Sequence, residues 1–153
     1  MPRRSSSPRF RRLSHADAYQ LARGGWADRA VRFTRIEIRA GLTAPREARW
    51  AVEAHLDDAL GERELNEVRL MTSELVTNAL RHGEISDGIV LHVAVSDRQV
   101  RVEVRDDGPG FAPSPDLQPG GYGLRLVDEL ATRWGASGDD GTCVWFELDL
   151  PGP

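Results

Sequence analysis

The stretch MTSELVTNALRHG, residues 71–83, is the part of the sequence around which the rest of the chain is organised, and it carries the first candidate site residues. We expect it to be the second half of a helix that begins near residue 63 and ends before Gly83. Glu74 and Asn78 are four residues apart, so they lie one turn from each other on one side of that helix. Apolar residues at helical spacing predict that another side contacts a core: Leu65, Val68, Leu75, Val76 and Ala79.

Glu74 and Asn78 offer two complementary kinds of chemistry on one helix face. A carboxylate can accept a proton, and a carboxamide oxygen is a neutral ligand for a hard cation such as Mg²⁺. A Glu-xxx-Asn pair taken alone is more typical of a solvated polar face. Residues about thirty positions further along the chain therefore decide between a site and a plain surface.

The composition indicates one soluble globular domain. A chain of 153 residues can bury a sizeable core, and its hydrophobic content of 40% and charged content of 29% are ordinary for a folded protein. The net charge of −4 argues against general binding to nucleic acid, so we expect no direct nucleic-acid partner. All 20 basic residues are arginine, which excludes mechanisms that need a catalytic or phosphate-binding lysine.

Cysteine and histidine usage indicate a reducing compartment and no structural metal. Cys143 is the only cysteine, so an intrachain disulfide is impossible. We find no hydrophobic signal segment and no apolar run of transmembrane length, so we expect a cytoplasmic protein that does not enter a membrane. The four histidines, at positions 15, 55, 82 and 92, lack metal-ligand spacing, which predicts no structural zinc.

The charge is distributed unevenly along the chain. Residues 1–30 carry seven arginines against two aspartates, a local charge of +5, which leaves −9 for residues 31–153. The first region is rich in Arg, Ser and Pro and poor in core-forming residues, so we expect a disordered basic arm ahead of one folded domain. The arm is interpreted either as a simple tail or as a basic segment that contacts an acidic partner.

Alternation and helical spacing predict an order of strand, helix, helix, strand, strand, helix and strand. The strand at 99–106 is informative, because Val100, Val102 and Val104 share one face and the alternation places Asp106 on that same face. A carboxylate at the end of an apolar face is costly unless it has a function. The alternative is an aspartate of a tight turn. The expected helices are 45–60, 63–82 and 122–133, the expected strands are 31–39, 88–96, 99–106 and 142–150, and 136–140 is a turn or a short strand.

The segment 107–121 has the features of a functional loop. It contains four prolines and four glycines and is too long for a simple turn. It ends in Gly120-Gly121-Tyr122-Gly123, which opens the helix 122–133, and a glycine-rich turn at a helix N-terminus presents N–H groups to an anion such as a phosphate. The alternative is a flexible hinge. The chain lacks a GxxxxGK[ST] motif and a GxGxxG after its first strand, so we exclude a P-loop and a dinucleotide-binding site.

These stretches resemble a known family. ELVTNALRHG (74–83), DDGPGF (106–111), GGYGLRLVDELATRWG (120–135) and GTCVWFELDL (141–150) are similar to the conserved boxes and last strand of the GHKL, or histidine-kinase-like, ATP-binding superfamily. Within it, the chain looks like the anti-sigma-factor serine/threonine protein kinases, over about residues 31–150. The resemblance implies an α/β two-layer sandwich, with a mixed and mostly antiparallel sheet covered on one face by about three helices.

The resemblance also implies roles for individual residues. Glu74 would be the catalytic general base toward a serine hydroxyl of a partner, and Asn78 would be the Mg²⁺ ligand. Asp106 would bind the adenine amino group of ATP, and Thr142 would join the adenine network. The remaining residues would shape the adenine pocket or form the end of the lid and the phosphate-binding turn: Gly108, Gly110, Gly121, Gly123 and Leu124.

The implied protein binds ATP and Mg²⁺, sequesters a sigma factor as a homodimer, and phosphorylates a serine or threonine of an anti-sigma-factor antagonist. One departure is Tyr122, where many members of the family carry arginine. Because lysine is absent, cationic stabilisation of the γ-phosphate falls to an arginine such as Arg81 or Arg125. Two alternatives remain: a non-catalytic ATP-dependent partner-switching module, and a detached catalytic domain of a histidine kinase.

Overall fold

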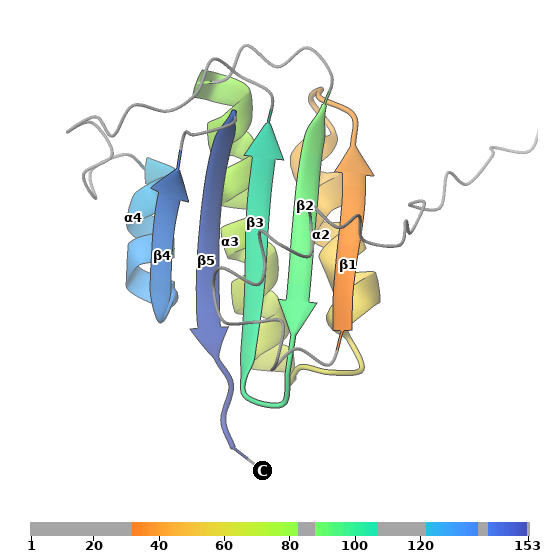
Figure 1. Cartoon of the computed structure of the whole chain (residues 1–153), viewed down its shortest axis with the longest axis vertical. Coiled ribbons are helices and arrows are strands. Elements are labelled where there is room, and N and C mark those ends of the chain that lie inside the picture. The colour runs from red at the N-terminus through yellow and green to blue at the C-terminus, as the bar shows by residue number, and fades with distance from the viewer. Residues whose placement is uncertain (1–31, 83–87, 107–121, 138–140, 153) are drawn as a thin grey trace, which may run out of the picture.

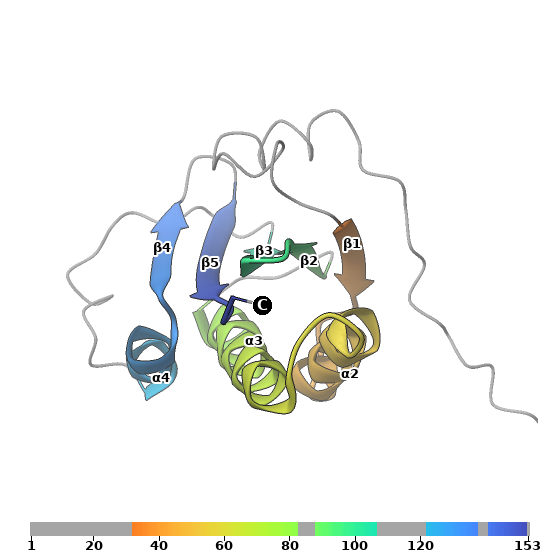
Figure 2. The same cartoon turned by 90° about the horizontal axis from the view of Figure 1, so that it is seen from below.

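The computed structural model describes residues 32–82, 88–106, 122–137 and 141–152. In this part of the chain, three helices cover one face of a five-stranded sheet (Figures 1 and 2). The strand order is β1-β2-β3-β5-β4, and every neighbouring pair is antiparallel. The predicted α/β two-layer sandwich is therefore confirmed. The elements are β1 Arg32–Ile38, α2 Ala44–Leu56, α3 Glu62–His82, β2 Ile89–Val95, β3 Gln99–Asp106, α4 Tyr122–Leu130, β4 Arg133–Ser137 and β5 Thr142–Asp149.

The core lies between the sheet and the helices, and alternation along the strands builds it. Val100, Val102 and Val104 of β3 are all buried in it, as the period of two predicts. The helix α3 contributes Val68 and Leu75, which recur at helical spacing. None of the described helices is both long and apolar enough to cross a bilayer.

The first helix is shorter than the sequence suggested. Pro45 lies in the first turn of α2, where its missing N–H is not needed, and the Thr43 hydroxyl donates to a Glu47 carboxylate oxygen at 3.1 Å. The helix was expected to reach residue 60 but ends at Leu56. The backbone then tightens, because Ala59 N–H and Leu60 N–H both donate to the Leu56 carbonyl at 3.0 Å.

The last helix also ends earlier than predicted, and the chain after it forms a strand. We expected a helix over 122–133 with Trp134 just beyond it, whereas α4 ends at Leu130 and Trp134 lies in β4. The cause is pairing with a strand distant in sequence. Thr132 N–H donates to the Glu147 carbonyl at 2.8 Å, and Trp134 then pairs with Phe146. Trp134 still packs against the core, and its indole N–H donates to Asp128 at 2.9 Å.

Gly88 precedes β2 at a point where the backbone leaves no room for a side chain. Its φ is +109°, and a Cβ there would lie 2.8 Å from the Ile38 carbonyl oxygen. We expect Gly88→Ala to lower the free energy of unfolding by about 1–3 kcal/mol. The matched control is Gly41→Ala, where a Cβ would meet nothing within 4 Å, and it should change stability by less than about 0.5 kcal/mol. Urea denaturation measures both, and equal effects of the two substitutions would contradict this account.

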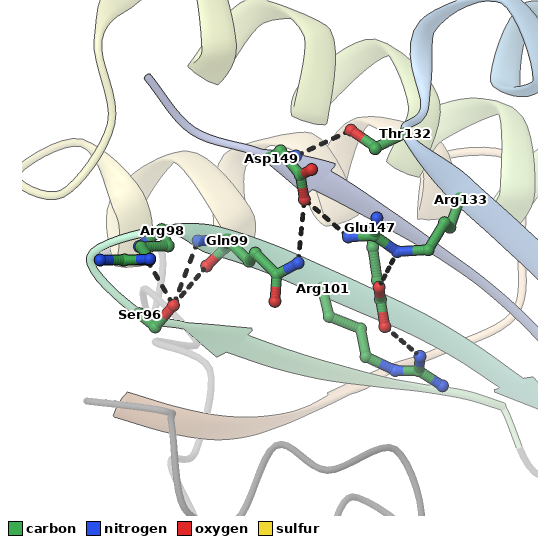
Figure 3. Close-up of polar contacts among 8 residues, drawn as sticks. All are labelled: Ser96, Arg98, Gln99, Arg101, Thr132, Arg133, Glu147 and Asp149. Atoms are coloured by element: carbon green, nitrogen blue, oxygen red, sulfur yellow. Dashed lines mark hydrogen bonds and ion pairs between the residues drawn. The ribbon is translucent and has the colours of Figure 1, made fainter. Parts of the chain in front are cut away.

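The sheet face turned away from the helices carries a network of paired charges (Figure 3). Arg101 donates to Glu103 at 3.0 Å along β3 and to Glu147 of β5 at 2.7 Å. Arg133 of β4 donates to Glu147 at 2.7 Å and to Asp149 at 2.6 Å. Arg105 donates to the second Glu103 oxygen at 3.3 Å. We call the set the charge ladder: Arg101, Glu103, Arg105, Arg133, Glu147 and Asp149.

Polar contacts also secure the lower ends of these strands in Figure 1. Gln99 donates its side-chain N–H to Asp149 at 2.9 Å, and the backbone N–H of Asp149 donates to the Thr132 hydroxyl at 2.9 Å. In the β2–β3 turn, the Ser96 hydroxyl oxygen accepts from the N–H of Arg98 and of Gln99 (Figure 3). The charge ladder thus joins β3, β5 and β4 through side chains as well as through backbone pairing.

Glu103 makes the stability depend on pH. Burial alone raises its pKa, but the hydrogen bond from His92, the charge and hydrogen bond of Arg101 and the charge of Arg105 outweigh burial and hold the pKa at about 2. Because this folded-state pKa lies below the ordinary value of 4.5, the ionised carboxylate stabilises the fold above about pH 4.5. That stabilisation is lost as the pH falls toward 2.

We expect the stability difference between the natural chain and Glu103→Gln to narrow by about 3 kcal/mol from pH 5 to pH 2. The glutamine variant has no carboxylate to protonate at this position, so it isolates the contribution of Glu103. Urea unfolding at half-unit pH steps measures the difference. Two stability curves that run parallel across this range would contradict the pKa assigned to Glu103.

Candidate functional site

The predicted site residues come from stretches far apart in sequence that meet at one edge of the sheet. The end of β3, the start of β5, the start of α4 and the end of α3 all lie at the upper end of the molecule in Figure 1. The helix α3 packs against β3, β5 and α4. The end of β3, which carries the candidate carboxylate, therefore lies at the same end of the molecule as the second half of α3.

Asp106 and Thr142 are direct partners across the β3–β5 pair. Asp106 is 9% exposed and follows the core residue Val104 on the helix side of the sheet, as the alternation predicted. Thr142 is half-buried. A carboxylate that accepts hydrogen bonds thus faces a hydroxyl that can donate or accept, at a separation of about 4.5–5.5 Å between Cα atoms.

The structure adds an apolar neighbour that the sequence analysis did not identify. Ile89, the first residue of β2, pairs with Asp106 on the side opposite Thr142, and it is fully buried. Asp106 therefore has an apolar neighbour, Ile89, on one adjacent strand and a hydroxyl neighbour, Thr142, on the other. No motif in the sequence pointed to Ile89 as a site residue, because its position opposite Asp106 depends on how β2 pairs with β3.

Glu74 and Asn78 lie one turn apart in α3, as predicted, and both are half-buried. Their neighbours Leu75 and Val76 are buried in the core, which fixes the rotation of the helix about its axis. The carboxylate and the carboxamide are therefore accessible from outside the core. No cluster of three or more His, Cys, Asp or Glu residues in the described ranges could hold a metal ion. Mg²⁺ usually takes most of its ligands from phosphate and water, so Asn78 could serve as a protein ligand beside them.

The start of α4 is the part of the fold where the sequence predicts an anion site. Gly123 lies in its first turn, and the buried Leu124 anchors that turn in the core. The first N–H groups of a helix have no partner within the helix, and the first turn of α4 contains no acidic residue that would oppose an anion. Gly108, Gly110 and Gly121 belong to the same predicted site but lie outside the described residues.

The arginines considered for the γ-phosphate differ in their surroundings. Arg125 is exposed on α4 and donates to Glu129 one turn later at 3.4 Å. Arg81 is exposed near the end of α3. Exposed ion pairs of the Arg125–Glu129 type contribute little to stability, so this guanidinium can exchange its partner at small cost.

The chain is similar to proteins of one known family. The model of the family "Histidine kinase-like ATPase domain" matches residues 38–148. The chain is 35% identical over 94 residues to the anti-sigma F factor of Geobacillus thermodenitrificans, and this match covers 52% of this chain and 63% of that protein. It is 34% identical over 90 residues to the anti-sigma F factor of Clostridium acetobutylicum, and this match covers 50% of this chain and 62% of that protein. The match thus spans less than two thirds of these curated relatives.

Among solved structures, the histidine kinase domain of the E. coli osmosensor EnvZ, determined by NMR, resembles this chain. The TM-score is 0.42 at 19% identity, over 78% of this chain and 89% of the EnvZ domain.

Proposed function

The chain belongs to the family of histidine kinase-like ATPase domains, and on this premise we propose that it is an ATP-binding anti-sigma regulatory protein with serine/threonine kinase activity. The observation that carries the proposal is the meeting of Asp106 with Thr142 at the strand ends beside the polar half of α3. The similarity to anti-sigma F factors supports the regulatory part. A sigma factor acts in the cytoplasm, so the proposal places the protein there.

Asp106 recognises the adenine of ATP. Its carboxylate accepts a hydrogen bond from the exocyclic amino group, and the Thr142 hydroxyl contributes a second polar contact. A hydrogen bond to a charged acceptor in a buried position is worth more than one made in water, so the burial of Asp106 favours adenine selectivity. Gly108 and Gly110, after the strand, would let the backbone approach the ring.

Asn78 and the first turn of α4 hold the phosphate end. The carboxamide oxygen of Asn78 would be the protein ligand of Mg²⁺, which neutralises phosphate oxygens when it is bound. Backbone N–H groups at Gly121, Gly123 and Leu124 would donate to the phosphates. The N-terminal dipole of α4 adds to this attraction.

Glu74 acts as the general base. It lies one turn before Asn78 and is half-buried, so its carboxylate is open to a hydroxyl presented by a second protein. The carboxylate would accept the hydroxyl proton of a serine or threonine while the γ-phosphoryl group passes from ATP to that hydroxyl oxygen and ADP leaves. Phosphorylation then weakens the antagonist's interface by adding charge. The proposed partners are this antagonist and a sigma factor, bound by a homodimer.

Phosphotransfer from γ-labelled ATP to candidate antagonist proteins tests the reaction. We expect label on serine or threonine, which survives acid treatment of the product. Acid-labile label, as on a histidine, would contradict the proposal and point to a histidine-kinase catalytic domain. Label that depends on neither Mg²⁺ nor ATP concentration would contradict it as well.

A second candidate function has one specific observation in its favour. The chain contains no lysine to bind the γ-phosphate, and the exposed Arg125 forms a surface ion pair with Glu129. A non-catalytic module, in which ATP controls partner exchange without transfer, fits that observation. Binding of the partner that changes between ATP and ADP without any phosphorylation would support the module.

A further inference from the structure

The outer side of α2 presents a stripe of exposed side chains. Arg46, Trp50 and Ala54 follow one another at intervals of four residues, and Asp57 comes three residues after Ala54. This spacing places all four on one side of the helix, opposite the residues of α2 that pack in the core. All four are exposed, and Trp50 is 57% exposed. We call this set the α2 stripe.

Trp50, in the middle of the stripe, has a positioned ring. The guanidinium of Arg46 lies over it, with the guanidinium carbon 5.0 Å from the ring centre. Tryptophan and arginine are enriched at protein interfaces, where a few such residues supply most of the binding energy. An exposed tryptophan taken alone is an ordinary surface feature. The charges at the two ends of the stripe therefore decide what the stripe binds.

Arg46 and Asp57 stand at the two ends of the stripe, and neither forms an ion pair within the described residues. By contrast, the next residue, Asp58, is paired with Arg32 at 2.8 Å. Both charges of the stripe also oppose the dipole of their own helix, because Arg46 lies in the first turn and Asp57 is the C-terminal cap residue. Each would be stabilised beside the opposite end of a second helix.

An antiparallel copy of α2 provides both ends at once. Arg46 and Asp57 each lie about 8 Å along the helix axis from the midpoint between them. When two copies of α2 cross at this midpoint in opposite directions, Arg46 of each copy lies level with Asp57 of the other. Trp50 then lies close to Ala54 of the other copy, whose small side chain leaves room for the ring. The stripe is thus complementary to itself, as a twofold-symmetric interface requires.

We propose that the α2 stripe is the surface through which two copies of this chain associate. The inference rests on the homodimer of the proposed function and identifies its interface. The helices α2 and α4 lie on opposite sides of α3 (Figure 2), so pairing through α2 keeps the start of α4 clear of the interface. A helix of 13 residues is only about 20 Å long and forms a small interface, so we expect a dissociation constant in the micromolar range.

Charge reversal tests the interface and its register. In a dimer, Arg46→Glu or Asp57→Arg places like charges opposite each other twice, so each variant should raise the dimer dissociation constant about tenfold or more. A mixture of the two variants regains both ion pairs in a mixed dimer, and a chain with both substitutions regains them with itself. Trp50→Ala, which keeps the charges, should also weaken the dimer about tenfold or more. Sedimentation equilibrium from micromolar to several hundred micromolar protein measures all of these.

Arg98→Glu is the matched control, because it makes the same change of charge at an exposed position in the β2–β3 turn, and its dissociation constant should equal that of the natural chain. Natural affinity in either charge-reversal variant would overturn the proposal. Failure of both the mixture and the doubly substituted chain to regain affinity would overturn it too, as would a natural chain that stays monomeric throughout.

Calorimetric titration of the same proteins with ATP separates the interface from the nucleotide site. We expect the natural chain and every variant to bind ATP alike. A natural chain that stays monomeric but binds ATP would contradict the interface and leave ATP binding in place. Dimers that respond to charge reversal as expected, in chains that bind no ATP, would support the interface and contradict the nucleotide site.

Discussion

Glu74→Gln is expected to lower the rate of phosphoryl transfer about 10²- to 10⁴-fold, the range over which a positioned general base accelerates a reaction. Glutamine keeps the size and polarity of the side chain but cannot accept the hydroxyl proton. Because Glu74 is half-buried and lies outside the core, the substitution should leave folding intact. ATP affinity should stay within about twofold of the natural value, because a general base contributes to the transition state more than to nucleotide binding.

The matched control is Glu67→Gln on the same helix. Glu67 lies in the half of α3 that precedes the site, and Arg63 donates to it at 3.2 Å, so the substitution removes only a surface ion pair. Transfer measured from γ-labelled ATP should be unchanged in this control. If Glu74→Gln transfers phosphate as fast as the natural chain, Glu74 is not the base. If no chain transfers phosphate while ATP still controls partner binding, the non-catalytic module is favoured.

Asp106→Asn is expected to weaken ATP binding about 10- to 150-fold, which corresponds to 1.5–3 kcal/mol for a hydrogen bond to a charged acceptor. The neutral amide is a poorer acceptor, and its NH₂ group can turn toward the adenine amino group, which is also a donor. Binding of GTP should change much less, because guanine has a carbonyl oxygen where adenine has the amino group. The variant should therefore lose discrimination between ATP and GTP as well as affinity.

Asp97→Asn serves as the control for this experiment. Asp97 is exposed in the β2–β3 turn, at the opposite end of the sheet from Asp106. Titration calorimetry with ATP and with GTP measures both variants. An Asp106→Asn protein that binds ATP as tightly as the natural chain, or that keeps the same preference for ATP over GTP, would remove Asp106 from the adenine site.

The position of Asp106 could be predicted because it depends on local geometry. Alternation along β3 requires only that the strand be extended, so Val100 to Val104 placed Asp106 on the core side. The spacing of Glu74 and Asn78 depends in the same way on one helix. The spacing of residues within one strand or one helix was therefore enough to predict these positions.

The charge ladder could not be predicted, since it arises from pairing between distant strands. Arg101 and Glu147 are 46 residues apart and meet only because β3 pairs with β5 in one register. The alternation correctly assigned Arg101, Glu103 and Arg105 to one face, but it did not predict that Arg101 and Glu103 would be buried. Pairing with β5 also explains why α4 ends early, because the Thr132 N–H donates to the Glu147 carbonyl. The glycines of the loop 107–121 and the division at residue 30 remain predictions.

Titration of the natural chain with ATP in a calorimeter, with and without Mg²⁺, determines whether the chain binds ATP. We expect saturable binding of one ATP per chain, tighter with Mg²⁺ present because Asn78 and the phosphates share the cation. Absence of ATP binding under both conditions would contradict the account. The pairing of Asp106 with Thr142, at the end of the sheet where α3 also ends, would then be a feature of the fold without a nucleotide site.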